Sequence, residues 1–364
     1  MNFRHDSNVS NFKLFLKSLI NMTPKDRVVV CDFPSQFLFP PTGYGGIERW
    51  LWSVAKRSDE LGCEVVLSGP QWRSYLLPQA RHYKDRIEHH EKAAEFIKTN
   101  GRFDILIAGH EYFDDPDIVE SFKTVAENMF TYQLTAKPYT RVAHGDRCHL
   151  FCFSDEMMRL YADQKPKKML VVGEGEHEDP IPLETDNYLV WVGRLDKDKS
   201  PHYAVLAARK LGMDLFILGD IQYQPEYRDA YRDVLFSDGV KHFGVVSGKR
   251  KMELIGGAKC AFYTASPDWT EAAGLVLSEC IRSGVPVAGM TWKGDDSVVE
   301  AVGDNEGGYV NKIPLHASDK DIADALEDSA RRCFEIKREN ILNYGNSRYN
   351  PRSITEKFLS FTVP

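Results

Sequence analysis

The sequence lacks several features that define large classes of protein. No window of its 364 residues reaches the roughly 18 consecutive apolar positions that a membrane-spanning helix needs. The N-terminus has no uninterrupted apolar core of the kind found in signal peptides, and the chain contains no short repeat or low-complexity tract. We therefore expect a cytoplasmic protein rather than one that is secreted or crosses a bilayer.

Positive charge is also scarce. The 46 Lys and Arg residues are outnumbered by 53 Asp and Glu residues, which leaves a formal net charge of −7. Because no overall basic field attracts a polyanion, we expect no nucleic acid partner. An anionic ligand must instead be bound by a local site.

The seven cysteines do not suggest disulfides or zinc. Their odd number and their scatter through apolar runs are typical of reduced thiols in a core. One group of residues has the composition of a metal site, namely Cys148, His149 and Cys152 with His144 before them. It overlaps the apolar run 150–153. No second ligand pair stands at zinc spacing, so we favour a strand and expect no metal.

A short amphipathic helix is predicted near the N-terminus, over residues 12–20. Apolar side chains recur there at helical spacing, while two lysines take other faces. We favour docking of this helix onto the protein itself. The alternative is peripheral contact with the inner face of the membrane. The residues concerned are Phe12, Phe15, Leu16, Leu19 and Ile20, with Lys13 and Lys17.

Short β-branched runs alternate with amphipathic stretches from Arg27 onward, which is the pattern of parallel βαβ units. An acidic stretch with Gly and Pro at 173–182 is typical of a linker. A second series of alternating β-branched runs and amphipathic stretches follows it. The expected strands cover residues 28–30, 65–67, 104–108, 128–132, 150–153 and 169–172, then 189–192, 215–218, 240–243, 261–263 and 285–288.

The pattern predicts an α/β fold with two Rossmann-like, doubly wound parallel-sheet domains. We expect a first domain at 1–175 and a second at 176–349, with a C-terminal helix at about 350–364 that packs back on the first. Loops at the carboxyl ends of the strands would face a cleft between the domains, which is the natural place for a ligand.

Three loops contain residues suited to bind an anion. The first, at 40–48, contains Gly45 and Gly46, whose backbone amides can approach a ligand closely. The second, at 193–199, follows the first strand of the second domain and carries Arg194 and Lys199, two cations suited to a diphosphate. The alternatives are a tight turn without a ligand and a solvated basic turn.

The third loop, at 268–279, is the most informative. Glu271 is expected just before a helix and Glu279 about one and a half turns inside it, with the free amides of the helix N-terminus between them near Gly274 and Leu275. Two acids around an anion site fit a sugar, a diphosphate and a ribose. The alternative is a capping glutamate plus an exposed helical glutamate.

Together these segments resemble glycosyltransferase family 4 of the GT-B superfold, over nearly the whole chain. The stretch 41–49 is similar to the family's acceptor-side glycine loop, and 61–67 to its second strand. Gly193, Arg194 and Leu195 with Lys199 resemble its phosphate clamp, and 271–279 matches its E-x7-E signature. Ala272 and Ala273 stand where the family usually has Pro and Phe.

The resemblance implies roles for these residues in binding a nucleotide sugar. Arg194 and Lys199 would bind the pyrophosphate, Glu279 the ribose and Glu271 the transferred sugar. Further donor contacts would come from Gly45, Gly46, Gly193, Val246, Ala273, Gly274 and Leu275. The segment after the fifth strand lacks the family's His-Gly, so the histidine is His144, alternatively His110, or neither takes part.

The expected activity is that of a retaining glycosyltransferase that needs no metal. It would move a hexose from UDP-glucose or a similar UDP-hexose to a hydroxyl of a glycan or a lipid-linked acceptor, in polysaccharide biosynthesis. The alternatives are another GT-B enzyme, such as a sugar-nucleotide epimerase or a phosphorylase, and a nucleotide-sugar-binding partner without turnover.

Overall fold

The computed structural model describes residues 26–109, 112–113, 115–132, 148–170, 181, 184–272, 274–292, 294, 296–303 and 305–360. Among the helices of these residues, none combines the length and the apolar character needed to span a bilayer. The predicted helix at 12–20 lies outside the described residues, and so does the predicted linker at 173–182 apart from Ile181.

The first domain is built on a sheet of seven strands. Every neighbouring pair in it is parallel. The strands are β1 (Arg27–Cys31), β2 (Glu64–Ser68), β3 (Arg81–Tyr83), β4 (Phe103–Ile107), β5 (Ala126–Tyr132), β6 (Cys148–Cys152) and β7 (Lys167–Lys168), in the order β3-β2-β1-β4-β5-β6-β7. The helices are α2 (Gly46–Glu60), α3 (His90–Asn100), α4 (Pro116–Val125) and α5 (Asp155–Leu160).

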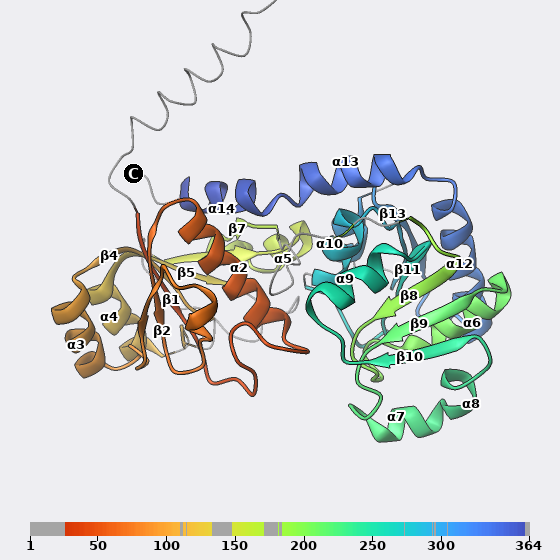
Figure 1. The fold of residues 1–364 in the computed structure, drawn as a ribbon, viewed down its shortest axis with the longest axis horizontal. Coiled ribbons are helices and arrows are strands. Elements are labelled where there is room, and N and C mark those ends of the chain that lie inside the picture. Colours follow the sequence, from red (N-terminus) through yellow and green to blue (C-terminus); the bar gives the residue numbers. More distant parts are fainter. Residues whose placement is uncertain are drawn as a thin grey trace, which may run out of the picture.

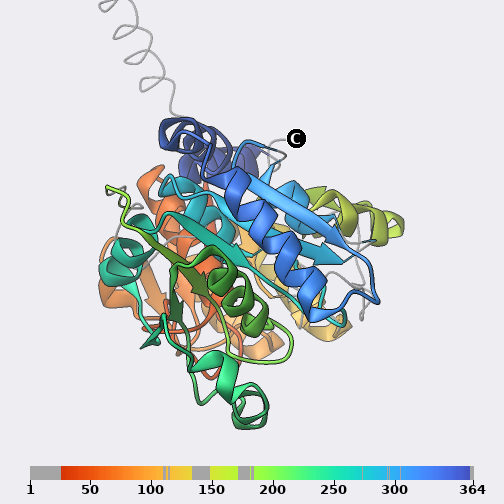
Figure 2. The same ribbon diagram turned by 90° about the vertical axis from the view of Figure 1, so that its right-hand side faces the viewer.

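The second domain repeats this plan with six parallel strands. They are β8 (Tyr188–Val192), β9 (Asp214–Leu218), β10 (Val240–Gly244), β11 (Cys260–Tyr263), β12 (Val287–Trp292) and β13 (Gly308–Ile313), in the order β10-β9-β8-β11-β12-β13. The helices up to residue 333 are α6 (Pro201–Leu211), α7 (Pro225–Ala230), α8 (Arg232–Leu235), α9 (Gly248–Gly256), α10 (Leu275–Arg282), α11 (Ser297–Val302) and α12 (Asp319–Cys333). Figure 2 shows the second domain from its outer side, with α6 in green and α12 in blue over one face of the sheet.

The central strands of both sheets are buried, as expected for parallel sheets that helices cover on both faces. Val28, Val29 and Val30 of β1 are all fully buried, as are Leu189 and Val190 of β8. Such continuous apolar runs need helices on both sides, because each strand turns apolar side chains to both faces. The expected α/β fold with two doubly wound sheets is confirmed.

Strand order reverses between β1 and β4 in the first sheet and between β8 and β11 in the second. Loops at such a switch point diverge and leave a crevice at the carboxyl ends of the strands. The segments that follow β1, β8 and β11 are the three loops singled out from the sequence. The topology therefore brings all three to the cleft edges of their sheets.

The C-terminal helices return from the second domain to the first (Figure 1). After α13 (Arg338–Arg348), α14 (Pro351–Ser360) lies against α2 and the first sheet. Phe358 is 2% exposed, and its ring lies 4.8 Å from that of Phe130 and 5.7 Å from that of Phe151, measured between centroids. The chain thus crosses between the domains twice.

A second contact between the domains joins α5 to α11. The backbone N–H of Asp155 donates to the Glu300 carboxylate at 2.6 Å, and that of Asp296 donates to the Glu156 carboxylate at 2.8 Å. Each helix start thus binds a carboxylate from the other domain, which is favourable because helix N-termini carry partial positive charge. The Ser154 and Ser297 hydroxyls also lie 3.3 Å apart.

Several strands differ from the prediction in position or were missed. The run at 169–172 is not the last strand of the first sheet, since β7 ends at Lys168 and residues 171–172 lie outside the described part. The strand predicted at 285–288 begins at Val287, because Val285 and Pro286 still belong to the approach from α10. The edge strands β3 and β13 carry too many polar residues to stand out as apolar runs.

Candidate active site

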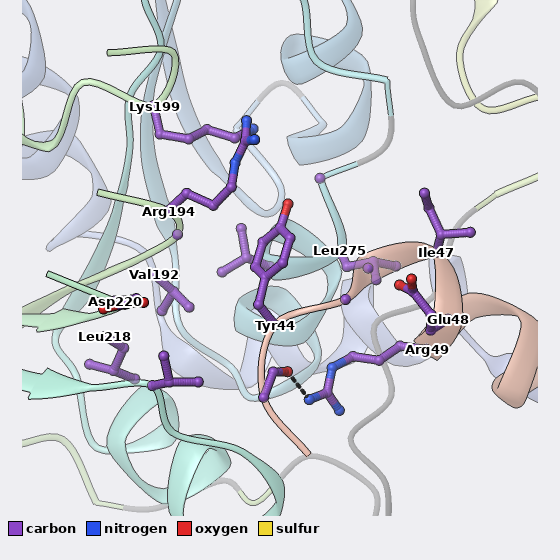
Figure 3. A pocket seen from close by; sticks show the side chains of 18 of the residues that line it. Tyr44, Ile47, Glu48, Arg49, Val192, Arg194, Lys199, Leu218, Asp220 and Leu275 are labelled. Carbon is purple, nitrogen blue, oxygen red and sulfur yellow. Dashed lines mark hydrogen bonds between the residues drawn. The ribbon is translucent and has the colours of Figure 1, made fainter. Parts of the chain in front are cut away.

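One cavity of about 510 Å³ lies between the two domains and is lined by residues from both. The first domain contributes the loop after β1 and the start of α2. The second contributes the loops after β8, β9, β10 and β11 together with α9 and α10. Figure 3 shows Arg194 and Lys199 on one side of this cavity, Tyr44 in the middle and Glu48 on the other side.

The loop after β1 needs its glycines for steric reasons. Gly45 has a φ of 134°, and a Cβ there would lie 2.8 Å from Pro41 Cγ and 2.9 Å from Glu48 Oε2. A Cβ on Gly43 would lie 2.9 Å from Val245 Cγ1 of the second domain. Arg49 closes the loop by donating to the Gly43 carbonyl at 2.5 Å. The loop tip therefore reaches the opposite domain.

The loop after β8 is ordered by a buried aspartate. Asp196 is 5% exposed; it accepts from the Lys199 N–H at 2.9 Å and lies 3.1 Å from Arg194 Nε. Burial raises the pKa of Asp196, while the Lys199 N–H and the Arg194 guanidinium counteract this rise. The Arg194 side chain is 16% exposed, so the alternative of a solvated basic turn does not apply to it.

Aromatic rings surround the Arg194 guanidinium. Its Cζ lies 5.9 Å from the ring centroid of Tyr44, 5.3 Å from that of Tyr223 and 5.2 Å from that of Trp269. Nη1 also donates to the Tyr223 hydroxyl at 3.1 Å. These contacts hold the cation at the cavity wall, since ring faces attract positive charge.

Glu271 lies in the loop before α10, and its carboxylate accepts hydrogen bonds from Lys199, Tyr263 and Gly274. Its Oε2 accepts from Lys199 Nζ at 2.5 Å and from the Tyr263 hydroxyl at 2.7 Å, and its Oε1 accepts from the Gly274 N–H at 3.2 Å. Gly274 is the N-cap of α10 with a φ of 53°. Glu271 therefore caps the helix, as the alternative interpretation held, and also lines the cavity.

Glu279 is buried on the second turn of α10, at 1% exposure. Its Oε2 lies 2.5 Å from Nζ of Lys251 on α9. Its Oε1 is buried and accepts from no group among the described residues. Because an unsatisfied buried acceptor is costly, this oxygen is ready to accept from a ligand. The alternative of an exposed helical glutamate is wrong.

Comparison with known proteins identifies the fold that carries this cavity. The family model for glycosyl transferases group 1 matches residues 173–348. AviGT4, a glycosyltransferase involved in avilamycin A biosynthesis, has a similar structure, with a TM-score of 0.72 and 17% identity over 93% of this chain and 97% of that chain. The chain has the GT-B fold.

Two further GT-B structures are similar over most of their length. A glycosyltransferase from Rickettsia africae ESF-5 gives a TM-score of 0.66 at 14% identity, covering 93% of this chain and 98% of that chain. A sucrose-phosphate synthase from Thermosynechococcus elongatus gives 0.64 at 12% identity, with coverage of 93% and 98%. No curated protein matches by sequence.

The GT-B cleft brings together every predicted site residue that the structure describes. Ala273, His144 and His110 lie outside the described residues, so their predicted roles are not tested. Within the described part of the chain, no cluster of three or more His, Cys, Asp or Glu could hold a metal ion. The predicted residues that line the cavity are Gly45, Gly46, Gly193, Arg194, Lys199, Val246, Glu271, Gly274, Leu275 and Glu279.

Sequence reasoning assigned no role to several residues that line this cleft. Lys251 stands in the basic run 249–251, which was the only signal for it, and its pairing with Glu279 depends on how α9 packs against α10. Tyr223 follows β9 in a loop without a motif. Trp269 lies inside the 268–279 segment, and its buried indole N–H has no acceptor among the described residues.

Proposed function

We propose that this protein is a retaining glycosyltransferase that moves a hexose from a UDP-sugar, such as UDP-glucose, to a hydroxyl of an acceptor. One observation carries the proposal. Arg194, Lys199, Glu271 and Glu279 line a single interdomain cavity at the N-terminus of α10. Two cations and a helix end suit a diphosphate, and two carboxylates suit the sugar hydroxyls on either side of it.

Stabilisation of the leaving diphosphate is the main catalytic effect in this proposal. When the anomeric C–O bond breaks, the sugar gains positive character and the diphosphate gains negative charge. Arg194, Lys199 and the amides at Gly274 and Leu275 offer fixed positive charge for it, without a metal ion. Removing one preorganised donor typically costs about 3 to 4 kcal/mol, or roughly a hundred- to thousandfold in rate.

Donor binding would require Glu271 to exchange partners. In the structure its carboxylate occupies the Lys199 ammonium and the Gly274 N–H, the same two donors that the proposal assigns to phosphate. A diphosphate would compete for both, since it carries more negative charge than one carboxylate. Glu271 would then turn to hydroxyls of the transferred sugar, beside the reacting carbon.

Glu279 would bind the ribose through its free oxygen. Lys251 holds one carboxylate oxygen at 2.5 Å, and the other is buried without a donor among the described residues. Val246, which lines the same cavity after β10, would hold the base through its backbone. In a retaining reaction without an assigned base, a leaving-group oxygen would take the acceptor proton.

We further propose that the acceptor is a glycan or a lipid-linked saccharide in polysaccharide biosynthesis, and that the protein works in the cytoplasm or at the inner face of the membrane. The fold relatives named above include a glycosyltransferase of avilamycin A biosynthesis and a sucrose-phosphate synthase. A glycosyltransferase with the same fold over nearly its whole length supports transfer as the reaction class.

Incubation with UDP-glucose in EDTA, without an acceptor, tests this function. We expect slow release of UDP and glucose, because water can replace the acceptor, and faster UDP release when saccharide acceptors are added. Glucose 1-phosphate formed on addition of phosphate would instead indicate a phosphorylase, and UDP-mannose would indicate an epimerase. Tight binding of UDP-glucose without any turnover would indicate a non-catalytic partner and contradict the proposal.

A further inference from the structure

Trp269 lies beside both cations of the proposed donor site. The centroid of its ring is 4.5 Å from Lys199 Nζ and 5.2 Å from Arg194 Cζ. Its side chain lines the interdomain cavity, and Figure 3 shows the two cations together on one side of that cavity. A single aromatic ring therefore contacts both of the charges that the proposed function assigns to the diphosphate.

Hydrogen bonds fix this ring relative to the cations. The Ser266 N–H donates to the Asp198 carbonyl at 2.8 Å, and the Thr264 hydroxyl donates to the Lys199 carbonyl at 2.6 Å. The Trp269 N–H donates to the Ser266 carbonyl at 3.2 Å, and its side chain packs against a buried apolar cluster of the second domain. The loop after β11 and the loop after β8 are thus joined, so the ring and the cations keep their relative positions.

Carboxylates also hold these cations, but they reduce the positive charge that a ligand meets. Arg194 Nε lies 3.1 Å from an Asp196 oxygen, and Lys199 Nζ lies 2.5 Å from a Glu271 oxygen. A carboxylate cancels the charge of the cation that it binds. An aromatic ring is neutral and attracts a cation through the negative face of its π system. The ring contact therefore orients each cation and leaves its full charge available to an anion.

The contact with Lys199 matters most during donor binding. In the proposed function, Glu271 leaves Lys199 and turns to the transferred sugar. Lys199 Nζ would then keep the ring faces of Trp269 at 4.5 Å and Tyr263 at 5.8 Å. A lysine side chain is long and flexible, so losing a fixed partner costs it its orientation. A ring that stays in place keeps the ammonium directed to the cavity throughout this exchange.

Two simpler roles are available to a tryptophan in a cavity wall. It can fill space at the edge of a core, or its ring can pack against a sugar. Neither role accounts for the position of the Trp269 ring beside two cations. Both can be separated from a role in anion binding, because a space-filling role affects stability and a sugar-packing role needs a sugar.

We propose that Trp269 is a positioning residue that holds Lys199 and Arg194 toward the diphosphate without neutralising them. This inference rests on the proposed function and adds to its donor site a residue that acts through the two cations. The ring face carries the effect, and the indole N–H does not.

Calorimetric titration of inorganic pyrophosphate in EDTA tests this role, since pyrophosphate has neither base nor sugar. We expect Trp269→Leu to weaken pyrophosphate binding about fivefold to thirtyfold, because the ring contacts with both cations are lost. Trp269→Phe keeps a ring face without the indole N–H and should stay within about threefold of the wild type. Tyr75→Leu is the matched control, because Arg73 Cζ lies 5.7 Å from the Tyr75 ring centroid and neither residue lines the cavity.

Three outcomes would overturn the inference: the wild type does not bind pyrophosphate, Trp269→Leu binds it as tightly as the wild type does, or Trp269→Phe loses as much affinity as Trp269→Leu. If Trp269→Leu melts far below the wild type, Trp269→Met replaces it, because a flexible side chain fills the gap without a ring. The same loss of affinity is expected there, and unchanged affinity contradicts the role. Pyrophosphate binding needs no turnover, so a failure to release UDP from UDP-glucose would reject the proposed function separately.

Discussion

At the scale of single residues, Glu271 and Glu279 differ in what holds their carboxylates. Glu271 is bound by Lys199, Tyr263 and the Gly274 N–H, so it must leave partners before it can act on a sugar. Glu279 is held at one oxygen by Lys251 and has its other oxygen unsatisfied within the described residues. The two acids should therefore affect different steps.

Alanine variants of these acids separate the two steps. We expect Glu271→Ala to lower the rate of UDP release from UDP-glucose roughly a hundred- to thousandfold with little change in UDP affinity. Glu279→Ala and Arg194→Ala should weaken UDP binding about tenfold to a hundredfold, since each loses a charge-assisted hydrogen bond. Calorimetry and a UDP-release assay measure these effects, with Glu253→Ala as the control, since the half-buried Glu253 pairs with Arg250 on α9 and does not line the cavity. If Glu271→Ala instead weakened UDP binding and Glu279→Ala lowered only the rate of UDP release, the two glutamates would bind the opposite ends of the donor.

A buried histidine gives a prediction about pH. His202 is 3% exposed, its Nδ1 lies 2.6 Å from the Tyr227 hydroxyl, and burial lowers its pKa from 6.5 to about 4. Between these two values the unfolded chain binds more protons, so stability is lost as the pH falls from 6.5 toward 4. From pH 6.5 to 5 this amounts to about 2 kcal/mol.

Urea unfolding at pH 7 and pH 5 measures this contribution. We expect His202→Gln to remove the His202 part of the acid destabilisation, so that its free energy of unfolding falls less between the two pH values than that of the wild type. His89→Gln is the control, because the His89 side chain is 75% exposed. Equal pH dependence in the wild type and His202→Gln would show that His202 is not held neutral by burial.

The site residues divide into those that sequence could predict and those that it could not. Arg194, Lys199, Glu271 and Glu279 stand at loops or helix starts after strands, where topology alone brings them to the cleft. Lys251 could not be found this way, because its contact with Glu279 depends on the rotation of one helix against another. The buried state of Asp196 likewise depends on how its loop folds back over the sheet.

At the scale of elements, the start of α10 decides whether the proposed anion site can form. Gly274 adopts a φ of 53°, and a Cβ there would lie 2.8 Å from Leu277 Cδ1. A side chain would also occupy the approach to the first amides of the helix. This position therefore needs glycine for both its backbone conformation and its lack of side-chain volume.

Two glycine substitutions separate the cost of a left-handed backbone from the cost of a crowded side chain. Gly274→Ala should cost about 1 to 2 kcal/mol for the left-handed backbone and a further cost for the contact with Leu277, and it should weaken UDP binding. Gly212→Ala shares a positive φ of 64°, but its Cβ would meet nothing within 4 Å, so only the backbone cost applies. Urea unfolding and calorimetry make the comparison. Equal losses of stability with UDP binding intact would contradict the crowding argument.

Periodicity predicted most elements of both sheets, since their central strands are apolar on both faces. It missed β3 and β13, which lie at sheet edges and carry residues such as Arg81, His82, Asn311 and Lys312. An edge strand is paired on one side only, so its pattern need not be continuously apolar. The order of the strands also could not be predicted, because local sequence does not say which strands pair.

At the scale of the whole molecule, the domains are joined beside the cavity and also at its wall, where Ala272 and Leu275 pack with the core of the first domain. The α5–α11 contact and the passage of α13 and α14 over both domains tie the two halves together (Figure 1). The loop tip at Gly43 and Tyr44 lies against Val245 and near Arg194 without a strong bond. This arrangement would permit the cleft to open and close around a donor.

Substitution of Phe358 tests how much the packing of α14 on the first domain stabilises the molecule. We expect Phe358→Ala to lower the free energy of unfolding by about 3 to 5 kcal/mol, because a fully packed ring is removed from between Phe130 and Phe151. Lys357→Ala, on the exposed face of the same helix, should change it by no more than about 0.5 kcal/mol. Urea unfolding provides the measurement. Similar stabilities for both variants would show that α14 contributes little.

Calorimetric titration of UDP in EDTA, into the wild type and into Lys199→Ala, tests whether this cleft holds a nucleoside diphosphate by fixed cations and the start of α10. We predict that UDP binds the wild type without added metal and that Lys199→Ala weakens binding at least about tenfold, since a charge-assisted contact to phosphate is lost. The absence of UDP binding to the wild type, or equal affinity in both proteins, would contradict it.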